Sequence, residues 1–223
     1  MIHPIRYFGD PVLRKRALPV TRFDEALRTL ADDMIETMYD ANGVGLAAPQ
    51  IGVSKRLFVA LELAPEQEDE SEGEQHEAAG ASAVDDGEDD APPEVKRRSW
   101  GVVGEHVMVN PSFVSRTGEQ FGHDGCLSVP GLYVDALRRD LRVRVRYQDV
   151  TGGWHQLDAE GHFAHVLQHE YDHLEGVLFF DRLPEDERRA FLEEHRAELA
   201  DMQRQAKALI KELRRAPIEV AVE

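Results

Sequence analysis

The pattern of apolar and polar positions divides the chain into short strands and three helical segments. Apolar residues recur at helical spacing between about 24 and 40, and Asn42-Gly43 is a suitable signal for the end of that helix. We predict strands at 56–61 and 106–110. Strict alternation at 141–147 predicts a third strand, which Thr151-Gly152-Gly153 turns into 154–157 as a hairpin.

Further along, residues 160–174 have a helical apolar stripe that Gly176 ends. The apolar run 177–180 then predicts a short strand, and Pro184 is expected to open a long polar helix that reaches about residue 215. Mostly antiparallel strands with non-alternating helices predict an α+β fold, with sheets packed around the 160–174 helix and a long C-terminal helix.

Residues 65–97 interrupt this pattern and contain the charge excess. The chain has 223 residues and a net charge of -17, but 13 acidic residues and no Lys or Arg lie between Glu66 and Glu94. Outside that stretch, 30 acids face 26 bases, so the rest of the protein is only mildly acidic. Such a segment buries too little apolar surface to offset its ordering entropy. We therefore expect a single domain over 1–223 with a flexible acidic insertion at 65–97, closed by the basic triplet 96–98.

The chain has neither a run of about 18 apolar residues nor a signal-peptide core at its start. We expect a cytoplasmic protein without membrane contact, and a monomer. The single cysteine, Cys126, excludes an intramolecular disulfide; it is either a small buried residue or a metal ligand.

The helix at 160–174 carries the segment His169-Glu170-Tyr171-Asp172-His173. Two histidines four residues apart project from one helix face and can bind one divalent ion, while Glu170 can reach a water beside it. A catalytic metal site usually has three protein ligands. Glu175 follows too closely, His195 lies within the predicted last helix, and His165 is a packed neighbour more readily than a ligand.

Cys126 is the better third ligand, because Gly125 permits a close backbone approach and a thiolate suits zinc or ferrous iron. Another segment, Gly43-Val44-Gly45-Leu46-Ala47-Ala48-Pro49-Gln50, lacks the lysine of a phosphate loop. By itself it is equally compatible with a close approach to a ligand and with a tightly packed turn.

Taken together, three segments resemble the motifs of the peptide deformylases: 43–50 the first, Gly125-Cys126-Leu127-Ser128 the second and Gln168–His173 the third. The long C-terminal helix is closest to the bacterial type-1 form, whereas the acidic insertion is unusual. Asp124 stands where the family usually has Glu, and it is expected to pair with an arginine near 138 or 139, a pair that the shorter side chain puts in question.

The resemblance implies removal of the formyl group from the N-terminal formylmethionine of new proteins. Cys126, His169 and His173 would hold one divalent metal ion, Fe²⁺ in the cell or Zn²⁺, Ni²⁺ or Co²⁺ in purified protein. Metal-bound hydroxide would attack the formyl carbon, with Glu170 as general base and then general acid. Gln50 and the backbone N–H of Leu127 would stabilise the oxyanion, and Gly45 would hydrogen-bond the substrate.

Other expectations concern partners. Phe163, His165 and Val166 are candidates to line a pocket for the methionine side chain. The basic end of the last helix would contact the ribosome, or would only complement the helix dipole, and its cations are Arg204, Lys207, Lys211, Arg214 and Arg215. A zinc endopeptidase would share the two histidines but not the other two motifs, and a non-enzymatic binding module would use the acidic insertion.

Overall fold

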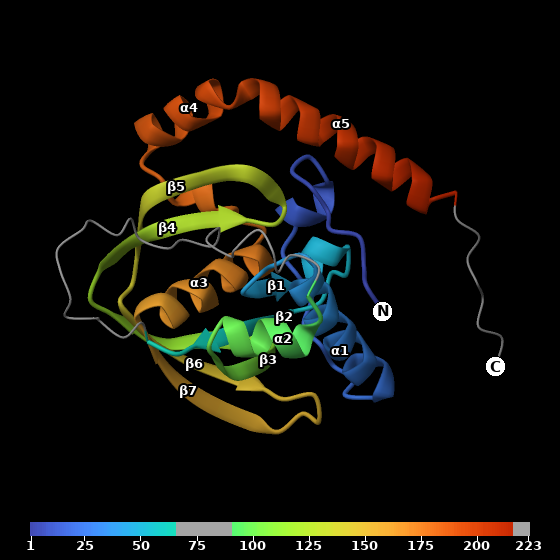
Figure 1. Cartoon of the computed structure of the whole chain (residues 1–223), viewed down its shortest axis with the longest axis vertical. Coiled ribbons are helices and arrows are strands. Elements are labelled where there is room, and N and C mark those ends of the chain that lie inside the picture. The colour runs from blue at the N-terminus through green and yellow to red at the C-terminus, as the bar shows by residue number, and fades with distance from the viewer. Residues whose placement is uncertain (66–90, 216–223) are drawn as a thin grey trace.

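The computed structural model describes residues 1–65 and 91–215 (Figure 1). Its α-helices are α1 (Glu25–Asp40), α2 (Pro93–Ser99), α3 (Gly161–Glu175), α4 (Glu185–Glu194) and α5 (Arg196–Leu213). Short 3-10 helices are η1 (Pro11–Arg14), η2 (Ala48–Ile51) and η3 (Phe179–Arg182). The strands are β1 (Gly45–Ala47), β2 (Leu57–Leu63), β3 (Val102–Thr117), β4 (Gln120–Cys126), β5 (Val129–Arg139), β6 (Arg142–Gln148) and β7 (Trp154–Glu160).

These strands form two antiparallel sheets. In the described part of the chain, five strands make a sheet in the order β1-β2-β3-β6-β7, and β4 pairs with β5 in a separate sheet. Helix α3 lies between the two sheets and contacts β1, β2 and β4 (Figure 1). The predicted α+β class, with antiparallel sheets around a central helix and a helix near the C-terminus, is confirmed.

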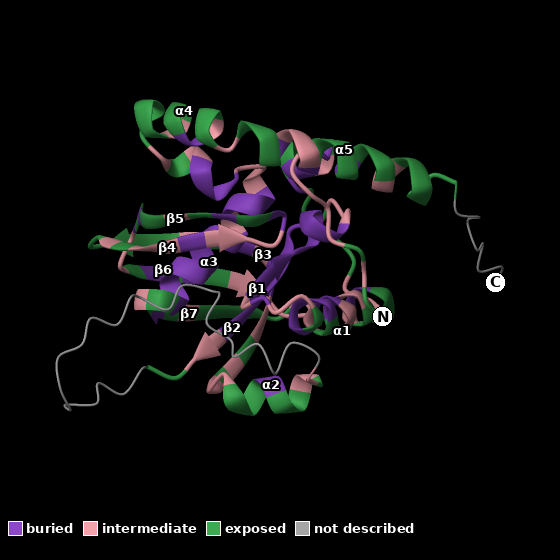
Figure 2. Cartoon of the chain, turned by 45° about the horizontal axis from the view of Figure 1, so that its top comes forward, coloured by how far each residue is buried: buried purple, intermediate pink, exposed green. Residues whose placement is uncertain are grey.

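Alternation along β2 explains how the larger sheet is covered on both faces. Leu57, Val59 and Leu61 pack with the apolar face of α1, whereas Phe58 and Ala60 pack with α3. Side chains of successive strand residues point to opposite faces, so one short strand joins two hydrophobic cores. Figure 2 shows β1, β2 and α3 as the most buried part of the molecule. Helix α3 is consequently held rigidly from the side of the larger sheet.

The last two helices cover the outer side of the β4–β5 sheet. Phe191 of α4 and Leu199 and Met202 of α5 pack with Val129 and Leu137 of β5. The outward surfaces of both helices are exposed (Figure 2). No helix within the described ranges is long and apolar enough to cross a membrane.

The predicted helix at 24–40, the strands at 56–61, 106–110 and 141–147, the hairpin and the helix at 160–174 are all present. Asn42 ends α1 as expected: its backbone is left-handed, with a φ of 54°, and Gly43 N–H donates to Met38 O at 2.9 Å. This is the C-terminal geometry in which Asn or Gly is favoured.

Two predicted elements are wrong. Residues 177–180 do not form a strand, because the Asp181 carboxylate accepts the N–H of Leu178 and starts the turn η3, which buries Phe179 and Phe180. The predicted long helix at 184–215 is interrupted at His195. The ring of His195 packs edge-on against the ring of Phe191, with ring centroids 4.6 Å apart. The change of direction there lets both helices reach the same core (Figure 1).

The predicted acidic insertion also needs a correction at its end. Residues 66–90 of it lie outside the described residues. Residues 93–97 are not a loop but the beginning of α2, and Lys96 is buried there rather than neutralising the base of a loop. The described end of the insertion is therefore an ordered element that packs on α1.

Candidate active site

Helix α3 presents the two candidate histidine ligands from one face. Phe163, Leu167 and Leu174 anchor the helix in the core, and Gly176 ends it with a φ of 75°. The rings of His169 and His173 lie one turn apart, with centroids separated by 5.0 Å. This spacing places two ring nitrogens on the side of the helix that faces β4.

Cys126 approaches these histidines from the end of β4. Its Sγ lies 3.2 Å from His173 Nε2, and one ligand atom from each of Cys126, His169 and His173 lies within 4.8 Å of the others. The ligand atoms of a tetrahedral Zn²⁺ site, with bonds of about 2.0–2.3 Å, are separated by about 3.5 Å. A thiolate and two imidazoles at these distances fit a transition-metal ion of the zinc or ferrous iron kind.

Asp124 orients one of these ligands. Its Oδ1 lies 2.6 Å from His169 Nδ1 and its Oδ2 lies 2.9 Å from His165 Nε2. Although burial opposes the charged form, His169 together with His165 holds the pKa of Asp124 well below its usual range. An ionised Asp124 accepts the Nδ1–H of His169, which leaves Nε2 to face Cys126, as a carboxylate behind a metal-binding histidine does.

Arg139 holds this carboxylate in turn. Its guanidinium bonds Asp124 Oδ2 at 2.7 Å and Asp172 Oδ2 at 2.6 Å, and all three side chains are buried. Asp172 also pairs with Arg182. The expected arginine pair of Asp124 is therefore present, and Arg139 rather than Arg138 provides it, since Arg138 is exposed and pairs with Glu119.

The electrostatics of the helix differ from one side chain to the next. Burial lowers the pKa of His173 well below its usual value, so its ring is neutral and able to bind a cation. Burial alone would lower the pKa of His169, but the Asp124 carboxylate offsets this and raises it. Burial raises the pKa of Glu170 to about 7. A carboxyl group with a pKa near neutrality suits both uptake and release of a proton.

Glu170 also has a free binding position. Among the described residues, its Oε2 atom is buried and has no hydrogen-bonding partner. Buried oxygens of this kind call for a water or a ligand. The backbone of Gly45 lies close to Glu170 on the opposite side of the site. A Cβ atom at Gly45 would stand 2.8 Å from Glu170 Cδ, so only glycine allows this approach.

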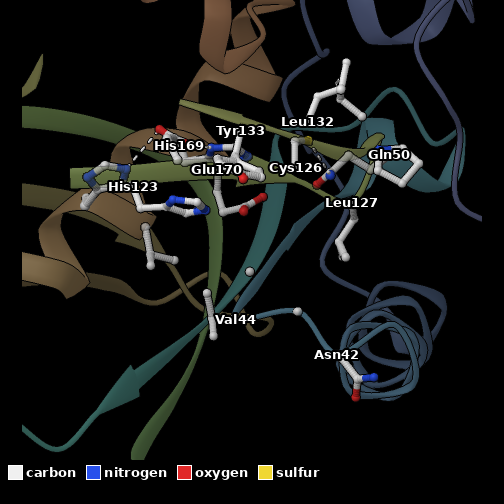
Figure 3. Close-up of a pocket in the computed structure, with 18 of the residues that line it drawn as sticks. Asn42, Val44, Gln50, His123, Cys126, Leu127, Leu132, Tyr133, His169 and Glu170 are labelled. Atoms are coloured by element: carbon white, nitrogen blue, oxygen red, sulfur yellow. Dashed lines mark hydrogen bonds and ion pairs between the residues drawn. The ribbon is translucent and has the colours of Figure 1, made fainter. Parts of the chain in front are cut away.

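Gln50 lies on the other side of Cys126 from Glu170 (Figure 3). The N–H of Ala47 donates to Gln50 Oε1 at 2.7 Å, which fixes the amide. Gln50 Nε2 is thereby directed toward Cys126 Sγ, at 3.7 Å, and Ser128 Oγ, at 3.4 Å. The amide can therefore donate to an oxygen placed beside the metal ligands.

A cavity of about 390 Å³ connects these groups (Figure 3). It is lined by Gly45, Gln50, Cys126, Leu127, His169 and Glu170, among others. Of the three pocket candidates, His165 and Val166 line it, whereas Phe163 packs in the core beside His106. His195, at the junction of α4 and α5, and Glu175, paired with Arg56, are not part of the cluster.

The structure thus brings all seven predicted site residues into one region, with six of them along the cavity and His173 behind it. Sequence reasoning missed the bond from Asp124 to His169 and the role of Ser128, whose N–H donates to Cys126 Sγ at 3.4 Å. Both residues lie within two positions of the cysteine, and that adjacency was the available signal.

An α+β fold with a thiolate–imidazole metal site beside a buried carboxylate defines a metal-dependent hydrolase. The family model for polypeptide deformylase matches residues 2–189. A peptide deformylase of Thermus thermophilus is 49% identical over 213 residues, which cover 96% of this chain and 98% of the relative. The chain belongs to the polypeptide deformylase family, and is therefore an enzyme of the metallohydrolase class.

Solved structures agree with this assignment. The crystal structure of a peptide deformylase from Thermus thermophilus matches with a TM-score of 0.73 and 44% identity, covering 92% of this chain and 99% of that chain. A peptide deformylase from Legionella pneumophila matches with a TM-score of 0.66 and 38% identity, covering 92% of this chain and 97% of that chain.

Proposed function

We propose that this protein removes the N-formyl group from the N-terminal formylmethionine of newly made proteins. The observation that carries the proposal is the cluster of Cys126, His169 and His173 beside a cavity that Glu170 and Gln50 line. Family membership supports the same reaction. The single-domain organisation of residues 1–223 stays a prediction.

Cys126, His169 and His173 would hold one divalent ion, which we propose to be Fe²⁺ in the cell, with Zn²⁺, Ni²⁺ or Co²⁺ as substitutes. When bound, such an ion acts as a Lewis acid that brings the pKa of a water near neutrality. The pair of Asp124 and His169 keeps Nε2 of that ring turned toward the ion, and the neutral His173 needs to lose no proton to bind it.

Glu170 would move the protons. Its pKa of about 7 allows it to take a proton from the attacking water and to deliver that proton to the leaving amine. The carboxylate of Glu170 lies against the cavity wall made by Gly45, whose backbone would hydrogen-bond the extended peptide. Gln50 Nε2 and the N–H of Leu127 would stabilise the tetrahedral oxyanion, and such preorganised donors are worth about 3 kcal/mol each.

A direct assay tests this function. Protein prepared without oxygen, with its metal content measured, is offered formyl-Met-Ala-Ser and, separately, unformylated casein. We expect formate release from the peptide and no cleavage of casein. Glu170→Gln should keep the metal but lose nearly all turnover, whereas Glu160→Gln, an exposed carboxylate at the N-terminus of α3, should be unchanged. Cleavage of casein without formate release would favour the endopeptidase alternative.

We also propose a ribosome contact through the end of α5. Lys207, Lys211, Arg214 and Arg215 lie together on one exposed surface, which could bind RNA phosphates. Arg204 is already paired with Asp201. The same cations also complement the helix dipole, so only binding data separate the two roles.

A further inference from the structure

We propose that Lys96 of α2 is a positioning residue for the segment Asn42–Gly45, and thereby for peptide binding. This inference rests on the proposed deformylase function. Lys96 belongs to α2, which follows the acidic stretch, yet its side chain is only 1% exposed. A buried lysine is costly unless its ammonium group has close acceptors, so its position calls for an explanation.

The Lys96 ammonium lies at the C-terminal end of α1. Nζ donates to the carbonyl oxygen of Tyr39 at 2.8 Å and to the side-chain oxygen of Asn42. It also lies 5.8 Å from the centroid of the Trp100 ring. A cation in this place interacts favourably with the unsatisfied carbonyl groups at a helix C-terminus. Lys96 therefore fixes the last turn of α1 from outside that helix.

Asn42 links Lys96 to the cavity, because it accepts a hydrogen bond from Lys96 and also lines the cavity. Its φ of 54° is left-handed, and it redirects the chain from α1 into Gly43, Val44 and Gly45. All four residues line the active-site cavity (Figure 3). The direction of this wall is thus set at one left-handed turn, at Asn42, and Lys96 holds the side chain of that residue.

The backbone at Gly43 and Gly45 has little room to move. A Cβ atom at Gly43 would lie 2.8 Å from Leu127 Cδ1, and one at Gly45 would lie 2.8 Å from Glu170 Cδ. A small rotation at Asn42 would move the backbone either into these side chains or away from a peptide. We therefore expect loss of Lys96 to weaken peptide binding while the metal ligands and Glu170 stay in place.

Other contacts fasten α2 independently of Lys96. Arg97 donates to Glu105 Oε1 at 2.6 Å, and the Tyr39 hydroxyl donates to the same oxygen at 2.6 Å. Trp100 packs against the Tyr39 ring with centroids 5.8 Å apart. Helix α2 should hence remain docked when Lys96 is shortened or made neutral, which makes the substitution a test of positioning.

The test compares Lys96→Met with Arg98→Met, which removes the same charge from an exposed position of α2. For hydrolysis of formyl-Met-Ala-Ser, we expect Lys96→Met to raise KM by about tenfold, which is about 1.4 kcal/mol. Its kcat and metal content should stay within about twofold of the wild type, as should every parameter of Arg98→Met. Unchanged KM in Lys96→Met, or a loss confined to kcat, would overturn the proposal.

Asn42→Gly provides a second variant that keeps the left-handed turn but lacks the acceptor oxygen. It should also raise KM, and the double variant Lys96→Met/Asn42→Gly should be no worse than Lys96→Met alone, because both changes remove the hydrogen bond between Lys96 and Asn42. If the effects of the two substitutions on KM added up in the double variant, Lys96 would not act through Asn42. If Lys96→Met does not fold, the KM of Asn42→Gly decides, and an unchanged value refutes the inference.

Amide hydrogen exchange gives a readout that does not depend on turnover. Gly43 N–H donates to Met38 O, so its exchange should become about tenfold faster in Lys96→Met, while amides of β6 keep their protection. A wild-type protein that releases no formate would refute the proposed function, and exchange at Gly43 would then decide the positioning by itself. Unchanged exchange at Gly43 in Lys96→Met would refute the positioning role of Lys96.

Discussion

Removing Arg139 should be far more damaging than removing its neighbour Arg138. Arg139 joins two carboxylates whose side chains are 2% and 5% exposed, Asp124 and Asp172. Arg138 instead pairs with Glu119 at the surface, where the two side chains are 61% and 56% exposed. The substitutions Arg139→Met and Arg138→Met change the same charge and nearly the same volume, so they isolate the effect of burial.

Breaking a buried ion pair typically costs about 3–5 kcal/mol, because one charge stays buried without its partner. Here Asp172 keeps Arg182 and Asp124 keeps two histidines, so we expect the lower end, about 3 kcal/mol. The exposed pair of Arg138 and Glu119 is screened by water and contributes far less. With a urea m-value of about 2 kcal/mol/M, the unfolding midpoint of Arg139→Met should fall by about 1.5 M, against less than about 0.5 M for Arg138→Met.

Urea unfolding gives the midpoints of both variants. The metal content of the samples must be matched, because an ion that binds only the folded state would add to its stability. Metal content after dialysis should also fall in Arg139→Met, because Asp124 no longer orients His169 as firmly. Midpoints of the two variants within about 0.5 M of each other would refute the assignment of a structural role to the buried network.

Three further predictions concern the site and the last helix. Cys126→Ala should release the metal, measured by metal analysis after dialysis; full retention would remove Cys126 from the ligand set. Gly45→Ala should lower kcat/KM by at least about tenfold in the formyl-peptide assay, because its methyl group would meet Glu170, and wild-type kinetics would contradict the close approach. Trimming the chain after Gln203 should weaken co-sedimentation with ribosomes, most clearly at low salt, and undiminished binding would exclude the contact.

Local sequence was sufficient wherever a short-range pattern determines the structure. The spacing of His169 and His173 on a helix, the alternation at 141–147 and the helix end at Asn42-Gly43 all depend on neighbouring residues only, and the structure contains each of them. The wrong predictions depended on side-chain contacts that the hydrophobic pattern does not reveal. The apolar run at 177–180 was open to either a strand or a turn. The bond from Leu178 N–H to the Asp181 carboxylate and the packing of Phe179 and Phe180 with residues of β5 and α4 decided it.

The sequence by itself determined the chemistry of the site: a thiol, two imidazoles, a carboxylate and an amide in three ordered segments. Only the tertiary structure decided how those groups are tuned and held. Burial sets the pKa of Glu170, Asp124 selects the ring nitrogen of His169, and Lys96 reaches the end of α1 from 54 residues away. The reason is physical, because desolvation and ion pairing depend on what surrounds a side chain in space, and a linear pattern carries no such information.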